Sequence, residues 1–170
     1  MTSKLKTDVL ETGSGSGTIA LNNQLSGMTS ASVPAGSVLQ VLSSKALSTQ
    51  ETTSTSWVDT NLSLSITPSA TSSKIMIHHT FSSVCLVSAT SGASFRIMRD
   101  STSLHTPASG HQIYTDSSQI YTNFSYMELD SPSTTSAITY KIQVRTHNSN
   151  RVFVGDTRFP NTITLTEIKG

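Results

Sequence analysis

The chain has 170 residues and a formal net charge of +1, and only 12 % of its residues are charged. A chain of this length can form one domain with a real hydrophobic core, and its balanced charge argues against a nucleic-acid binder, which would present a basic face. Ser and Thr make up about a third of the residues, so hydroxyl groups rather than charges are expected to hydrate the surface.

Residues 1–35 differ from the rest of the chain. The stretch TGSGSGT leaves the backbone unrestrained, and no part of the segment carries enough apolar residues to build a core. Apolar side chains nevertheless recur along it, which is uncommon in pure linkers: Leu5, Val9, Leu10, Ile19, Leu21 and Leu25. We therefore predict an extended N-terminal arm whose apolar residues anchor it to a partner; a flexible tail without a partner is the alternative.

From residue 36 onward the pattern is that of β-strands. In the stretch 57–67, Leu62, Leu64 and Ile66 alternate with Ser and Thr, which directs one face inward and one toward water. Comparable patterns predict strands over 38–47, 57–67, 74–87, 94–100, 119–129, 137–147, 152–155 and 161–168, with a short strand near 113–114. Turns are expected at 68–73, 90–93 and 130–135 because Pro, Gly and Ser gather there.

About eight strands without a helical segment predict an all-β fold. The expected architecture is an antiparallel β-sandwich, jelly-roll-like, over residues 36–170. An immunoglobulin-like sandwich is disfavoured because the Cys…Trp…Cys spacing is absent, and no fixed repeat indicates a propeller or a β-helix.

Few residues suggest chemistry. His78 and His79 are adjacent in a predicted strand, so they should point to opposite faces, one exposed and one buried and hydrogen-bonded. No second His or Cys stands at a zinc-ligand spacing from them. Cys85 is expected to be a small buried hydrophobe, and the strand carboxylates Glu128 and Glu167 are expected to face outward. The sequence therefore predicts no enzyme and no catalytic, cofactor or metal site.

The aromatic residues are assigned to packing. Four of them crowd one region and are expected in the core or at a subunit interface rather than in a ligand platform: Tyr114, Tyr121, Phe124 and Tyr126. Trp57 is expected to be largely buried at the start of its strand, beside Leu62 and Ile66.

Three stretches resemble small virion structural proteins of tailed bacteriophages, especially those of cyanobacterial and marine phages. They are SKLKTDVLETGSGSGTIAL (3–21), TSWVDTNLSLSITPSATSSKIMI (55–77) and TITLTEIKG (162–170). The resemblance implies a trimeric β-sandwich with a structural rather than enzymatic role, located in the virion and assembled in the host cytoplasm.

The chain has no coiled-coil heptads, collagen repeat or β-helical shaft, which favours a head-surface protein over a long tail fibre. The resulting hypothesis is a homotrimeric capsid cement or decoration protein whose arm docks on the major capsid protein. The alternatives are a short tail-fibre or receptor-binding protein whose loop 101–118 contacts host surface glycan, and a glycan-cleaving enzyme. Neither nucleic acid nor a membrane is an expected partner, because no run approaches the ~20 apolar residues of a membrane helix.

Overall fold

The computed structural model describes residues 33–105, 107 and 111–170, and the part of the chain that it describes contains strands and no helix. The strands are β1 (Val38–Ala46), β2 (Gln50–Thr52), β3 (Val58–Ile66), β4 (Lys74–Leu86), β5 (Ser91–Arg99), β6 (Thr102–Ser103), β7 (Ile113–Thr115), β8 (Ile120–Asp130), β9 (Ile138–Thr146), β10 (Val152–Val154) and β11 (Asn161–Ile168). The compact unit that they form spans Pro34–Gly170.

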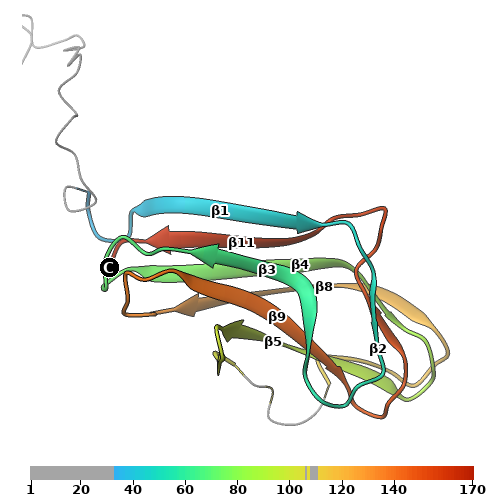
Figure 1. Ribbon diagram of the computed structural model, residues 1–170. Helices are drawn as coiled ribbons and strands as arrows, with labels where there is room; N and C mark the ends of the chain where they lie inside the picture. The colour runs from blue at the N-terminus through green and yellow to red at the C-terminus, as the bar shows by residue number, and fades with distance from the viewer. Residues whose placement is uncertain (1–32, 106, 108–110) are drawn as a thin grey trace, which may run out of the picture. The chain divides into compact units, whose positions relative to one another are not determined.

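The strands form two antiparallel sheets that pack face to face (Figure 1). In sheet A, β4 is central: β8 pairs with one edge of it, and β11 and β10 pair with successive parts of the other edge. β1 extends sheet A beyond β11, and β2 extends it beyond β10. In sheet B, β9 lies between β3 and β5, and the short strands β6 and β7 pair with β5.

The core lies between the sheets and follows from the two-residue period of the strands. Along β9, Ile138, Tyr140, Ile142 and Val144 are buried, while the residues between them are partly exposed. They pack in one cluster with the inward-facing aliphatic residues of β4 and β11: Ile75, Ile77, Ile163 and Leu165. Full burial of each such side chain contributes about 1.5–3 kcal/mol, so this inner layer is the main source of stability.

The predicted fold class is confirmed: the structure is an all-β, antiparallel, jelly-roll-like sandwich. Two details of the predicted elements were wrong. β5 begins at Ser91, inside the predicted turn 90–93, and the turn itself closes at Thr90, which has a φ of 55°. β2 and β6 were not predicted, because they are short, polar and defined by their pairing with β10 and β5.

The expected surroundings of Trp57 were also wrong. Trp57 is partly buried, but it does not belong to the core cluster that contains Leu62 and Ile66. Its ring lies against the guanidinium groups of Arg96 and Arg145. The reason is the pleat of the strand. Val58, the next residue, packs against the core, so the preceding side chain is directed to the outer face of sheet B.

Candidate functional site

The outer surface of sheet A is a regular four-strand surface that carries exposed apolar residues. β1, β11, β4 and β8 lie side by side there, and their register aligns outward-facing residues in rows across the sheet. We call this surface the sheet A face; its residues are Val38, Val41, Ser43, Lys45, Lys74, Met76, His78, Thr80, Ser125, Met127, Leu129, Thr162, Thr164, Thr166 and Ile168.

One row across the sheet A face is mainly apolar. Val41, Thr166, Met76 and Leu129 are successive cross-strand neighbours. Val41 is 57 % exposed and Leu129 52 %, and Met127, in the next row, is 57 % exposed. A solvated sheet face normally carries polar residues at such positions, and clustered exposed apolar side chains mark interaction surfaces.

The polar residues of the sheet A face hydrogen-bond to one another. The Ser43 and Thr164 hydroxyls are 3.2 Å apart. Ser125 Oγ lies 2.9 Å from His78 Nε2 and 3.1 Å from Thr80 Oγ1. Because these partners share one surface, covering them would leave hydrogen bonds in place, and the desolvation cost would be small.

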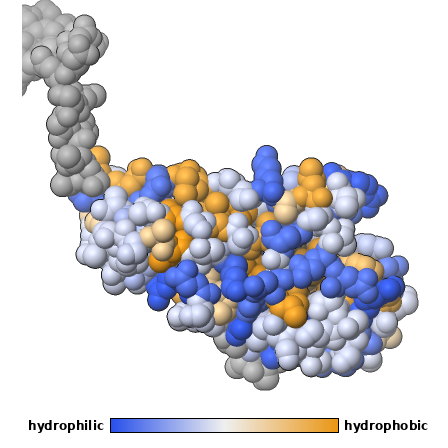
Figure 2. Space-filling view, in the orientation of Figure 1, coloured by the Kyte–Doolittle hydropathy of each residue, from blue (hydrophilic) through white to orange (hydrophobic). Residues whose placement is uncertain are grey.

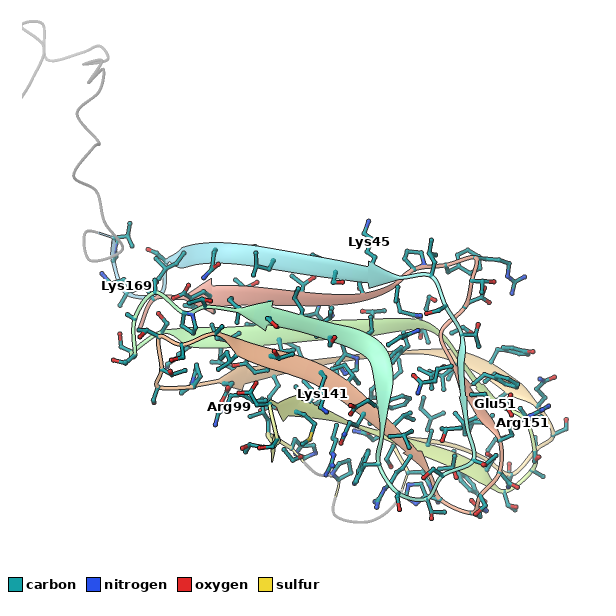
Figure 3. All side chains as sticks on the ribbon, in the orientation of Figure 1. Lys45, Glu51, Arg99, Lys141, Arg151 and Lys169 are labelled. Carbon is teal, nitrogen blue, oxygen red and sulfur yellow. The ribbon has the colours of Figure 1, made fainter. Side chains whose placement is uncertain are left out.

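The charge on the sheet A face is sparse and of one sign. Lys45 and Lys74 are its formal charges, and Lys45 points away from the sandwich (Figure 3). No carboxylate belongs to the fifteen residues that define the face. Sheet B differs, because a hydrophilic band crosses β9 and β3 (Figure 2), where Lys141 Nζ and Asp59 Oδ2 are 2.8 Å apart.

The two adjacent histidines face opposite sides of β4, as predicted. His78 lies on the sheet A face, and His79 is buried against Phe81, Phe124 and Tyr126, with ring centroids 5.4–6.4 Å away. The predicted hydrogen bonding of the buried ring fails at Nδ1, which has no partner. Burial, followed by repulsion from His78, lowers the pKa of His79 to about 4, so the ring is neutral at physiological pH.

The expectation that the strand carboxylates face outward was wrong for Glu167. This side chain is buried and accepts hydrogen bonds from Gln40 Nε2 at 2.7 Å and from the Ser69 amide at 2.7 Å and hydroxyl at 2.6 Å. Burial raises the pKa of Glu167, but the hydrogen bonds outweigh it and the net pKa is lowered. Glu167 therefore ties the turn after β3 to the ends of β1 and β11.

Glu128 also lies on the inner side of its strand, half-buried, where it accepts a hydrogen bond of 2.8 Å from the Tyr126 hydroxyl. Within the described ranges, no group of three or more His, Cys, Asp or Glu side chains is arranged to hold a metal ion.

The aromatic residues divide between packing and exposure. Phe124 is partly buried and stacks on Phe95 with a centroid distance of 4.5 Å, and Tyr126 also packs against the core. Tyr121 is 69 % exposed and Tyr114 49 %. Cys85 is buried, as predicted.

The predicted arm anchors Leu5, Val9, Leu10, Ile19, Leu21 and Leu25 lie outside the described residues. The sheet A face was not identified from the sequence, although a signal exists. In the segment 120–130, apolar and aromatic residues occupy both alternating sets of positions, which indicates a strand that is apolar on its outer face as well.

Searches for similar sequences among protein-family models and among curated proteins found no match. Among the described residues, the structure holds no helix long and apolar enough to cross a membrane.

Proposed function

We propose that the protein is a virion structural protein of a tailed bacteriophage, a homotrimeric capsid cement or decoration protein docked on the head by its N-terminal arm. The observation that supports this best is the sheet A face, which combines exposed apolar residues, internally paired hydroxyls and no carboxylate. Such a surface suits contact between subunits more than contact with water.

The composition fits the same role. A surface rich in Ser and Thr with few ion pairs loses little stability when the salt concentration changes. Strand pairing and burial between subunits would then supply the stability of a particle component. In this proposal the sandwich forms the knob, and the arm binds the major capsid protein.

The arm would bind by adding strands to a sheet edge of the capsid, because backbone hydrogen bonds can hold an extended segment while its side chains select the register. Ordering each residue costs about 1–2 kcal/mol of backbone entropy, and burying each of the six anchors returns about 1.5–3 kcal/mol. In this proposal the anchors offset part of the ordering cost, and backbone hydrogen bonds to the capsid would have to supply the rest.

The oligomeric state is tested by light scattering at micromolar concentration. A trimer has three times the 18.1 kDa of the single chain. Met127→Glu places a charge on the sheet A face at an exposed position and should yield monomers. The matched control is Ser63→Glu, at an exposed position on the outer side of sheet B, which should remain trimeric. A wild-type mass near that of one chain would contradict the trimer.

Docking is tested by deleting residues 1–35. The sandwich should stay folded and trimeric but should no longer bind purified particles, and full binding by the truncated protein would contradict the role of the arm.

A quantitative protein gel of virions separates the cement protein from the alternative, a short tail-fibre or receptor-binding protein. A cement protein is present in amounts comparable with the major capsid protein, and a fibre far below it.

A further inference from the structure

The outer face of sheet B carries a group of one aromatic and two cationic side chains, Trp57, Arg96 and Arg145, which we call the Trp57 cluster. The guanidinium carbon of Arg96 lies 4.6 Å from the centroid of the Trp57 ring, and that of Arg145 lies 4.7 Å from it. The three residues come from the start of β3, from β5 and from β9. The pairing of Val58 with Val144 places Trp57 beside Arg145.

Among the described residues, neither arginine of the Trp57 cluster is paired with a carboxylate. The other arginines of the described chain each have an acidic partner: Arg99 pairs with Asp130, Arg151 with Glu51 and Arg158 with Asp156. Two unpaired guanidinium groups on one indole ring are therefore an exception within this molecule.

The acidic residue that interacts electrostatically with Arg96, Asp59, is already engaged. Asp59 accepts hydrogen bonds from Lys141 Nζ at 2.8 Å and from Gln143 Nε2 at 2.6 Å. Arg96 Nε donates to Gln143 Oε1 at 2.7 Å. Burial, and then repulsion from Arg145, lowers the pKa of Arg96, in keeping with the two guanidinium carbons lying 4.6 and 4.7 Å from the same ring centroid.

Arg145 adds a second sign of an unfilled site. Its Nε is buried and has no hydrogen-bond partner, and a buried donor without a partner costs about 1–3 kcal/mol. An acceptor from outside the chain that approached the two guanidinium groups would remove the charge repulsion. If it reached Nε, it would also remove this cost.

We propose that the Trp57 cluster binds the carboxylate group of an acidic saccharide. A guanidinium group presents its donors in a planar fork that matches a carboxylate, and the exposed part of the partly buried indole offers an apolar contact to a sugar ring beside it. This inference does not depend on the proposed trimer, because the Trp57 cluster lies on sheet B and the sheet A face on the other sheet.

The surroundings favour a saccharide over nucleic acid. Asp59, next to the Trp57 cluster, pairs with Lys141, so the unpaired positive charge beside Trp57 is confined to the two guanidinium groups, whereas a nucleic-acid binder presents an extended basic face. On the other flank, the buried Ser94 hydroxyl lies 2.8 Å from His147 Nε2, and the partly exposed His147 ring lies 4.0 Å from the exposed ring of His111. Imidazole nitrogens can hydrogen-bond to sugar hydroxyls.

Trp57 is the single tryptophan of the chain, so its fluorescence reports on this site alone. Titration of the full-length protein with trigalacturonate should change this fluorescence with a Kd of about 1 mM, and calorimetry should give the same value. Arg96→Gln and Arg145→Gln should each weaken binding about tenfold. Arg145→Lys, which keeps the charge but not the fork, should also weaken it.

The matched control is Arg151→Gln. Arg151 also lies over an aromatic ring, that of Phe153 at 5.0 Å, but it has Glu51 as an acidic partner at 3.6 Å. Its replacement should leave trigalacturonate binding unchanged. Circular dichroism verifies that each variant is folded, and Arg96→Gln serves as the test if Arg145→Gln fails to fold.

Two further ligands test whether the site recognises an acidic saccharide or carboxylates in general. Neutral trigalactose of the same length should not bind, and a tri-glutamate peptide should bind at least about tenfold more weakly than trigalacturonate. The proposal is overturned if trigalacturonate gives no response, if both Gln variants bind it as the wild type does, or if the peptide binds equally well. In the last case the site would recognise carboxylates in proteins.

Discussion

Lowering the pH should destabilise the sandwich through His79. The pKa of this histidine is about 4 in the folded protein, against 6.5 for an unperturbed histidine. The unfolded chain therefore takes up a proton first as the pH falls, so the stability that the neutral ring allows is complete above about pH 6.5 and is lost progressively toward pH 4.

The size of the effect follows from the two pKa values. They differ by about 2.5, and each pH unit corresponds to about 1.4 kcal/mol, so the free energy of unfolding should fall by about 3 kcal/mol over this interval. Carboxylates with lowered pKa values, such as Glu167 and Asp59, lose their stabilising effect mainly below their ordinary values of 4.5 and 3.8, so they contribute chiefly at the acidic end.

The assay is urea unfolding of the wild type and of His79→Phe at pH 7.5, 6, 5 and 4.5. Phe at position 79 can pack against Phe81, Phe124 and Tyr126 and cannot be protonated. The free energy of unfolding of this variant should therefore fall much less between pH 6.5 and 4.5 than that of the wild type. His79→Leu serves as a second, smaller replacement.

His78→Gln is the matched control, because His78 is the exposed neighbour on the opposite face. Its profile should keep most of the wild-type decline, because repulsion from His78 is the smaller cause of the lowered pKa of His79. If His79→Phe and His79→Leu both decline with pH as steeply as the wild type, the buried neutral histidine is not the cause and the reasoning is refuted.

Three further predictions concern stability and are measured by chemical unfolding at pH 7.5. Gly155→Ala should cost about 3 kcal/mol, because the φ of Gly155 is +88° and a Cβ there would lie 2.5 Å from the Ser48 carbonyl oxygen. Gly36→Ala, at a φ of +85° with open space around the residue, should cost only about 1 kcal/mol. Equal costs for the two substitutions would contradict the steric argument. Tyr140→Phe removes a hydrogen bond of 2.7 Å to Asp130 and should cost about 1–2 kcal/mol, and an unchanged midpoint would show that this bond contributes nothing. Trp57→Ala should cost about 1–2 kcal/mol, because the ring is only partly buried. Truncation of a fully buried aromatic residue costs about 3–5 kcal/mol. A cost in that higher range would instead support the buried position expected from the sequence.

The sequence alone was sufficient to predict the fold class and most strands, because the alternation of apolar and polar residues that indicates a strand lies within a few consecutive residues. Alternation such as that of Leu62, Leu64 and Ile66 specifies a pleated strand with one apolar face, whatever the strand later pairs with. The opposite orientation of His78 and His79 follows from the same pleat, and so does the burial of one of them.

Tertiary structure decided the features that depend on which strands become neighbours. Glu167 could be stabilised inside only because Gln40 and Ser69, distant in sequence, meet it there. Likewise, Trp57 meets Arg96 and Arg145 only after β3, β9 and β5 have paired. The two-residue period of a strand determines which of its side chains share a face. The contacts between faces depend on strand order and register, which arise from long-range pairing and have no counterpart in the local pattern.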